Sequence, residues 1–161
     1  MRVEGTYRFP GPPDKVYDLL LDQAALQRCI PGCQTLEQKG EGQYEATLKV
    51  GVAAVRGTFT GQVHLTDLDP PQSYRMAIEG RGGPGFVKGT ALIRIEEDGA
   101  ESVVRVEGDG QLGGPMAGVA QRLLGGVARM MMDQFFGCMV TALPAAAAGD
   151  EPTTADAATK P

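Results

Sequence analysis

The sequence predicts an α+β protein, built from a seven-stranded antiparallel sheet with helices gathered on one face. Apolar residues recur at every second position over residues 2–9 and through most of 34–112, which is typical of strands with one buried face. The links between these stretches are short, and short links favour antiparallel neighbours. The last long apolar segment changes to a helical period, so a helix is expected to follow the sheet.

The N-terminal part of the chain predicts one strand followed by two short helices. Residues 2–9 alternate between apolar side chains and arginine, glutamate or threonine, as a half-buried strand does. Pro12 and Pro13 then favour a helix start, because proline is well accommodated in the first turn. Asp22 is expected to cap a second helix that ends near Cys29.

Six further strands are predicted after the second helix. Sequences rich in glycine, proline and aspartate separate them, namely KGEG, VGVA, LDPPQ, GGPG and EDGA, which are typical of turns. The predicted strands cover residues 34–38, 43–50, 54–66, 73–81, 86–97 and 101–112.

The longest helix is predicted from about Met116 to Ala142. On a helical projection, Arg122, Arg129 and Asp133 form a narrow polar stripe. The opposite face is apolar and comprises Ala120, Leu124, Val127, Met131, Phe135, Cys138 and Ala142. The charges and a central Gly-Gly pair argue against a membrane span, so we expect this helix to lie across the sheet.

Composition separates residues 1–143, the predicted folded domain, from residues 144–161. After Leu143 the chain contains alanine, proline, threonine, glycine and charged residues, but no large apolar side chain. Such a segment cannot bury enough surface to offset the entropy lost on ordering. We therefore expect a flexible, low-complexity tail.

Charge and composition exclude some functional classes. The 161 residues include 15 Lys and Arg against 20 Asp and Glu, a formal net charge of -5, and no basic cluster alternates with aromatic residues. Nucleic acid is therefore not an expected partner. The start, MRVEGTYRFPG, shows no secretory signal pattern, and three cysteines is an odd number, so a cytoplasmic location is expected.

Two of the three cysteines, Cys29 and Cys33, flank an Ile-Pro-Gly turn. A structural zinc site would need a second pair of ligands, and only the distant Cys138 and the single histidine, His64, remain. The spacing also differs from the Cys-x-x-Cys of redox proteins. The favoured interpretation is two small apolar side chains packed in a loop, with a Cys29–Cys33 disulfide under oxidation as the alternative.

The segment GRGGPG at residues 80–85 matches the glycine pattern of dinucleotide-binding loops. That pattern requires a following helix whose N-terminus faces the pyrophosphate, whereas a predicted strand follows here. A hairpin, or a close approach of the backbone to a ligand, is therefore the better interpretation.

Residues with side chains suited to acid–base chemistry are isolated in this sequence. His64 falls on the outward face of its predicted strand, without a serine, cysteine or carboxylate partner nearby in sequence. Asp67 and Asp69 lie in a predicted turn, where aspartate is favoured for backbone hydrogen bonding. Neither catalysis nor metal binding is expected from them.

Glycine is unusually frequent in this sequence, and methionine recurs at positions that bear on the interior of the fold. The chain has 23 glycines, about twice the usual share. Several methionines lie on the inward strand faces or on the predicted long helix, namely Met76, Met116, Met130, Met131, Met132 and Met139. Methionine adapts to irregular apolar sites, so a cavity between sheet and helix is one interpretation, and an ordinary filled core is the other.

Four further stretches of the chain are distinctive, namely CIPGC, VRGTFTGQVHLTDLDPP, SYRMAIEGRGGPGFVKGTALIRI and DGQLGGPMAGVAQRLL. Through them the chain resembles the carbon monoxide dehydrogenase G-subunit family, which has a START/Bet v 1-like fold, and the resemblance runs from Met1 to about Leu143. It implies a helix-grip arrangement, in which a strongly bent sheet wraps the long C-terminal helix around an apolar cavity. It also implies that CIPGC is a structural loop at the mouth of the cavity.

The resemblance further implies an accessory role without catalysis. Members of this family are encoded with molybdenum hydroxylases of the carbon monoxide dehydrogenase type, and the resemblance implies that they connect the enzyme to the membrane or to its lipophilic quinone acceptor. Expected partners are thus a lipid or quinone, the hydroxylase complex and a peripheral contact at the inner membrane face. No cofactor or metal is expected. Some relatives continue into an apolar anchor, which the polar residues after Leu143 do not resemble.

From this resemblance and the strand and helix patterns, we expect eight residues to line a cavity: Phe59, Met76, Ile78, Phe86, Leu123, Val127, Met131 and Phe135. Two alternatives remain open. One is a protein-docking module without a ligand. The other is a small cyclase or hydrolase, for which the candidate polar groups are Tyr7, Tyr74, Gln111 and Gln134.

Overall fold

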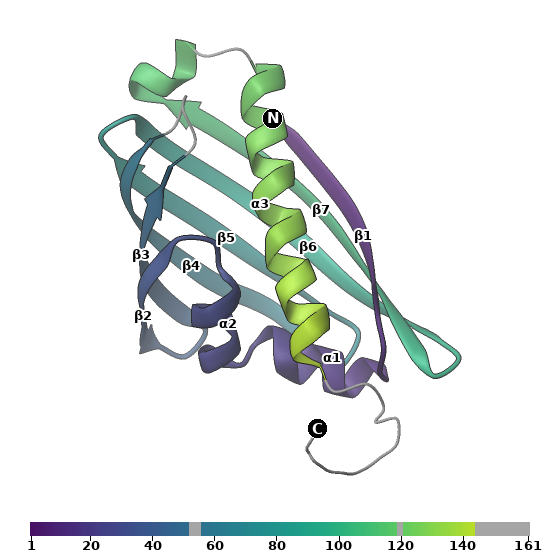
Figure 1. Cartoon of the computed structure of the whole chain (residues 1–161). Helices are drawn as coiled ribbons and strands as arrows, with labels where there is room; N and C mark the ends of the chain where they lie inside the picture. The colour runs from purple at the N-terminus through teal and green to yellow at the C-terminus, as the bar shows by residue number, and fades with distance from the viewer. Residues whose placement is uncertain (52–55, 119–120, 144–161) are drawn as a thin grey trace.

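A computed structural model describes residues 1–51, 56–118 and 121–143. Figure 1 shows one curved sheet with a long helix, α3, lying across it. Residues 54 and 55, at the start of a predicted strand, lie outside the described residues, as does Ala120 of the predicted helix. The expected tail, residues 144–161, is also outside them.

Seven antiparallel strands form the sheet, which confirms the predicted number and pairing mode. The spatial order is β1-β7-β6-β5-β4-β3-β2, so consecutive strands pair from β2 to β7 and β1 joins the far edge beside β7. The bounds are β1 Arg2–Phe9, β2 Cys33–Gly40, β3 Gln43–Val50, β4 Gly57–Asp69, β5 Ser73–Gly82, β6 Gly85–Asp98 and β7 Glu101–Gly113.

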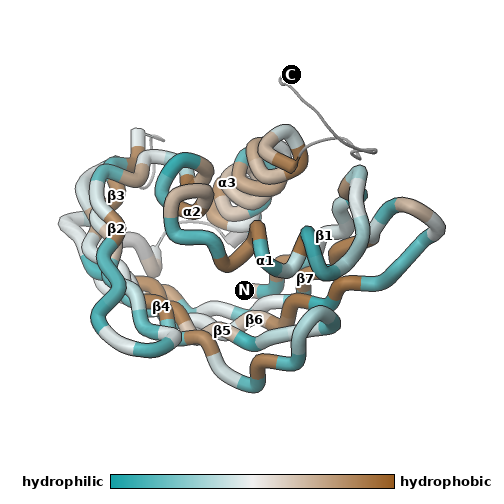
Figure 2. The backbone as a smooth tube through the Cα atoms, turned by 90° about the horizontal axis from the view of Figure 1, so that it is seen from below, coloured by the Kyte–Doolittle hydropathy of each residue, from teal (hydrophilic) through white to brown (hydrophobic). Residues whose placement is uncertain are grey.

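The sheet bends around α3, as Figure 2 shows in a view from below. β2 and β3 rise on one side of the helix, and β7 and β1 rise on the other. Within a strand, residues on the concave side alternate with exposed residues on the convex side, for example along β4 and β5. The concave side therefore receives the apolar half of each strand.

Two short helices, α1 (Pro13–Leu20) and α2 (Gln23–Cys29), follow β1 as the sequence predicts. Proline stands at the first position of α1, and the buried side chains of this helix include Val16 and Leu20. The Asp22 carboxylate accepts a hydrogen bond of 2.9 Å from the backbone N–H of Ala25, which satisfies a donor that the helix start leaves open.

The long helix begins later than the sequence analysis predicts. α3 spans Gln121–Ala142, and residues Gly114–Gly118 form a separate 3₁₀ helix, η2, instead of the first turn of α3. Gly114 has a φ of +74°, in the left-handed region, and Pro115 follows it. This glycine lies against Gly85, so the chain turns sharply here before the regular helix starts.

The GRGGPG segment forms the β5–β6 hairpin, as the strand that follows it indicates. Gly82 pairs with Gly85 across the turn, and β6 continues directly from it. A side chain on Gly82 would meet the Thr58 carbonyl oxygen at 2.5 Å, so its neighbours require glycine there. We call this side of the molecule, with η2 and the start of α3, the hairpin end, and the opposite side the α1 end (Figure 1).

The main core fills the α1 end, between α1, the C-terminal half of α3 and strands β1, β6 and β7. Phe136 stacks on Tyr7, with ring centroids 4.3 Å apart, and meets Phe9 edge-on at 6.4 Å. The Tyr7 hydroxyl donates a 2.6 Å hydrogen bond to Asp133 Oδ1. Burial, together with this carboxylate, raises the pKa of Tyr7 to about 12, so the bond is retained at neutral pH.

A second, smaller apolar cluster occupies the hairpin end. Leu124 of α3 is its buried centre, and Met1, Val50, Phe59, Val87, Leu112 and Val127 pack around it. The helix is thus held against the sheet at both ends.

Candidate functional site: an apolar cavity under α3

A cavity of about 340 Å³ lies between the concave face of the sheet and α3. Its wall combines strands β2 to β7 with all three α-helices, and almost every lining side chain is a hydrocarbon or a thioether. The apolar lining includes Leu20, Leu26, Ile30, Ala46, Leu48, Val63, Leu65, Met76, Ile78, Met131, Met132 and Phe135. The space suits an apolar molecule and disfavours water, which needs polar partners.

The cavity also explains why some side chains on the concave face of the sheet are only half-buried. Val63, Leu65, Met76 and Ile78 point to the concave side in the middle of the sheet, yet they are only half-buried. Ile93 and Val106 lie under the main core and are buried. Side chains at the centre of the sheet therefore border open volume, although Leu65 and Met76 also touch the edge of the main core.

Four of the eight residues expected to line a cavity do line this one. Met76 and Ile78 come from β5, and Met131 and Phe135 come from α3, one turn apart on the same face. The strand alternation and the helical period place these four side chains toward the same space.

The other four expected residues lie elsewhere. Phe59 and Val127 pack around Leu124 in the cluster at the hairpin end, where helix and sheet meet directly. Phe86 and Leu123 are 40% and 52% exposed, because they lie at the start of β6 and of α3, beyond the covered part of the sheet. The Phe86 ring lies under the Arg81 guanidinium, 5.8 Å from its centroid.

The sequence analysis missed a large part of the wall. Leu20 and Leu21 at the end of α1, together with Leu26, Ile30 and Pro31 in and after α2, close one side of the cavity. Strand β3 adds Tyr44, Ala46 and Leu48. The alternation in β3 could have revealed this second group, whereas no local signal shows how α1 and α2 lie over the sheet.

Polar side chains are sparse in the cavity. Of the four candidates for catalysis, only Tyr74 lines it. Tyr7 is bonded to Asp133 between β1 and α3, and Gln111 and Gln134 are exposed. Tyr74 is buried, which raises the pKa of its phenol above the ordinary value. The described residues thus do not bring an acid, a base and a nucleophile together in this space.

The CIPGC loop borders the cavity through Ile30 and Pro31, as the resemblance implies, but its cysteines differ from expectation. Cys29 forms a disulfide with Cys138 of α3, and Cys33 is free. The predicted alternatives, two packed thiols or a Cys29–Cys33 bond, are therefore wrong for Cys29. The physical reason is that α2 packs against α3, which brings the two Cα atoms within 5.4 Å.

Glycine is required in this loop. Gly32 has a φ of +73°, and a Cβ atom there would lie 2.2 Å from the Lys49 carbonyl oxygen. The Lys49 N–H also donates to the Gly32 carbonyl at 2.9 Å, so the loop is fastened to β3 through its backbone.

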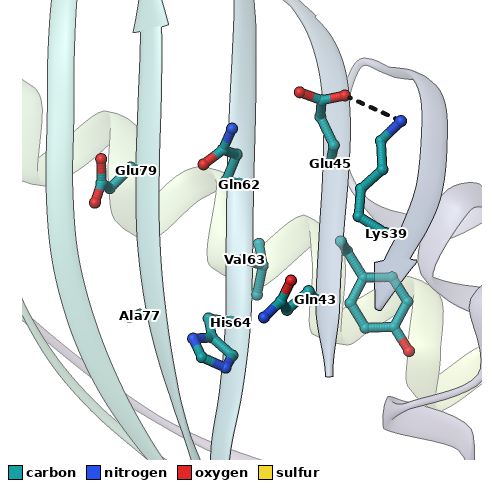
Figure 3. Close-up of a pocket in the computed structure, with 9 residues that line it drawn as sticks. Lys39, Gln43, Glu45, Gln62, Val63, His64, Ala77 and Glu79 are labelled. Carbon is teal, nitrogen blue, oxygen red and sulfur yellow. Dashed lines mark ion pairs between the residues drawn. The ribbon is translucent and has the colours of Figure 1, made fainter. Parts of the chain in front are cut away.

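A second depression, of about 400 Å³, lies on the convex face of the sheet (Figure 3). Its lining is mostly polar and exposed, with His64, Gln62, Gln43 and Glu79 on neighbouring strands. Lys39 lies 3.7 Å from Glu45 at its edge. Within the described ranges, no group of three His, Cys, Asp or Glu side chains is placed to hold a metal ion. This surface is a solvated sheet face.

Comparison with known proteins identifies the fold and the family. A family profile described as the G subunit of carbon monoxide dehydrogenase (CoxG) matches residues 5–144. A conserved protein from Geobacillus kaustophilus is 32% identical, with a TM-score of 0.87 over 92% of this chain and 97% of that chain. The search of curated proteins gave no match.

More distant structures share the fold alone. A START superfamily protein from Mycobacterium smegmatis is 12% identical, with a TM-score of 0.66 over 88% of this chain and 96% of that chain. Ara h 8.0201 is 17% identical, with a TM-score of 0.67 over 89% and 97%. The predicted START/Bet v 1-like fold is thus confirmed.

Within the described ranges, α3 and the shorter helices lack the long apolar sequence that a bilayer-crossing helix needs.

The profile match extends over most of the chain, and the similarity to the Geobacillus kaustophilus structure is as extensive. This protein therefore belongs to the carbon monoxide dehydrogenase G-subunit (CoxG) family.

Proposed function

We propose that this protein is a non-enzymatic accessory protein of a molybdenum hydroxylase of the carbon monoxide dehydrogenase type, and that it binds a quinone or a lipid in the cavity. The observation that carries this proposal is the apolar cavity of about 340 Å³. Family membership supports the partner, since the profile is described as a subunit of carbon monoxide dehydrogenase.

The hydrophobic effect would supply the binding energy. Burial of apolar surface contributes about 25 cal/mol per Å², so a ligand that buries about 200 Å² gains about 5 kcal/mol before the entropy of association is subtracted. The lining needs little rearrangement to receive such a ligand, because the volume is already present. Methionines in the wall, Met76, Met131 and Met132, can adapt to the shape of the guest.

Mass spectrometry of the protein purified from its native host tests both parts of the proposal. Under gentle ionisation we expect a mass increase from a small apolar molecule, which denaturing conditions release. We also expect components of a molybdenum hydroxylase to co-purify. A protein that carries neither would contradict the proposal. A partner enzyme without any small molecule would instead support the docking module, and refute the carrier.

We also propose a peripheral contact of the hairpin end with the inner membrane face, in the cytoplasm. This end exposes Phe86 and Leu123, and several cations without a carboxylate within 4.0 Å among the described residues. These cations are Lys49, Arg56, Arg81, Lys88 and Arg122. Such a surface suits anionic lipid headgroups, because apolar side chains can insert while cations meet phosphates.

The charge of the opposite end supports this orientation. The α1 end exposes a group of carboxylates on α1 and at the ends of β4 and β6, namely Asp14, Asp18, Asp67, Asp69, Glu97 and Asp98, of which Asp67 pairs with Arg75 and Asp98 with Arg8. An anionic membrane would repel these side chains. The overall charge of -5 is therefore unevenly distributed, and the hairpin end matches an anionic surface better than the α1 end does.

Vesicle sedimentation provides the test. We expect the protein to bind vesicles of phosphatidylglycerol and phosphatidylcholine, and to bind phosphatidylcholine alone more weakly. Leu123→Glu should lower partitioning about tenfold, because it removes an inserting side chain and adds a repelled charge. Leu68→Glu is the matched control, since Leu68 is 48% exposed but lies at the α1 end. Equal losses in both variants would refute the orientation.

A further inference from the structure

Among the described residues that line the cavity, only Tyr44 and Tyr74 carry a side-chain oxygen or nitrogen. The two phenols differ in environment. Tyr44 is half-buried and also borders the polar depression on the convex face, so solvent can reach it. Tyr74 is 5% exposed and lies on β5, two residues before Met76.

The Tyr74 hydroxyl forms no hydrogen bond within the described part of the chain, and its oxygen keeps a small accessible area, since it is not among the fully buried unpaired atoms there. Its nearest aromatic neighbour, Tyr17 of α1, meets the ring edge-on with centroids 5.8 Å apart. Tyr17 lies outside the lining, and its hydroxyl, unlike that of Tyr74, is fully buried without a partner. A buried phenol normally finds an acceptor, because leaving the donor unpaired is unfavourable.

We infer that the Tyr74 hydroxyl donates a hydrogen bond to a carbonyl oxygen of the bound ligand, which makes the cavity selective for neutral apolar molecules that carry a carbonyl group. This inference rests on the proposed carrier function. It specifies the class of ligand: an apolar body that fills the space beside Met76, Ile78 and Met131, and an acceptor oxygen that reaches β5.

The lack of cationic side chains in the described wall argues for a neutral ligand. No lysine, arginine or histidine lines the cavity among the described residues, so a carboxylate inside would lack a counter-ion. Burial raises the pKa of Tyr74, which keeps the phenol protonated and able to donate at neutral pH. A ketone, quinone or ester therefore fits the chemistry better than an ionised fatty acid.

A matched pair of probes tests the inference on the full chain. The neutral fluorophore N-phenyl-1-naphthylamine would first be bound, and then displaced by 2-undecanone or by 2-methyl-1-undecene, in which a methylene group replaces the carbonyl oxygen. Tyr74→Phe should lower the affinity for 2-undecanone by about three- to tenfold and change the affinity for the alkene by less than about twofold. Comparing both probes in both proteins isolates the hydrogen bond.

Tyr44→Phe is the matched control, since it removes the other phenol of the wall. It should change the affinities for the ketone and for the alkene by the same factor, because Tyr44 lines the wall but does not hold the carbonyl group. Thermal unfolding of each variant, followed by circular dichroism, verifies that the fold is retained.

The outcomes separate the inference from the function on which it rests. If Tyr74→Phe lowers the affinity for the ketone no more than the affinity for the alkene, the hydrogen bond is refuted while the carrier function stands. If Tyr44→Phe produces the selective loss, the anchor is assigned to the wrong phenol. If the wild-type protein binds neither the fluorophore nor the probes, both the inference and the carrier function fail.

Discussion

Met131→Trp is expected to abolish saturable uptake of N-phenyl-1-naphthylamine, or to weaken it by at least about tenfold. Met131 lines the cavity from α3, and the larger indole would occupy part of its 340 Å³. A tenfold loss corresponds to about 1.4 kcal/mol, which is the burial of about 55 Å² of apolar ligand surface. Fluorescence titration measures the effect, and because the wild-type chain contains no tryptophan, each variant carries the introduced indole alone.

The neighbouring methionine supplies a matched control. Met130 is 39% exposed and does not line the cavity, so Met130→Trp introduces the same side chain on the same helix without filling the space. We expect its uptake to equal that of the wild type. If Met131→Trp binds the fluorophore as well as Met130→Trp does, the ligand does not occupy this cavity.

Local patterns were sufficient to predict most of the strands and helices. In β3, for example, Tyr44, Ala46 and Leu48 alternate with polar neighbours, and the observed bounds are the predicted ones. The period of a half-buried strand is a property of a few consecutive residues, so it can be read without the tertiary structure. The pairing of β1 with β7 is different, because it joins segments about a hundred residues apart.

The helical period predicted an apolar face of α3 but not how deeply each part of it is buried. Phe136 and Met139 are buried against the main core, whereas Met131 and Phe135 are half-buried. In the C-terminal half of α3 these buried residues lie one position, or about 100°, from the row predicted at the centre of the face, whereas Leu124 of that row is buried at the hairpin end. The centre faces the cavity, and a sequence pattern does not distinguish an apolar wall from an apolar core.

The cysteine pairing could not be predicted from spacing. Cys29 and Cys33 are neighbours in sequence, but Cys138 is 109 residues from Cys29. Its proximity depends on how α2 packs on α3, which is a tertiary contact without a local signal. The same packing places Leu26 and Ile30 in the cavity wall, so the wall contributed by α2 was missed for the same reason.

Reduction of the Cys29–Cys138 disulfide is expected to lower the free energy of unfolding by about 4–5 kcal/mol. The bond closes a loop with a sequence separation of 109 residues, and chain entropy predicts about this stabilisation for a loop of that length. Urea unfolding of the wild-type protein with and without dithiothreitol measures the difference. Iodoacetamide labelling in urea should modify one cysteine before reduction and three after it.

Two variants assign this effect to the bond between the helices. Cys33→Ala should keep the full dependence on reductant, because Cys33 is free. Cys138→Ala should be as unstable as the reduced protein, and dithiothreitol should not change it further. If oxidised wild-type protein and Cys138→Ala unfold at the same urea concentration, the disulfide does not hold α2 to α3. In a reducing compartment the two sulfurs would be thiols, so the redox state there would set how firmly α2 closes the cavity wall.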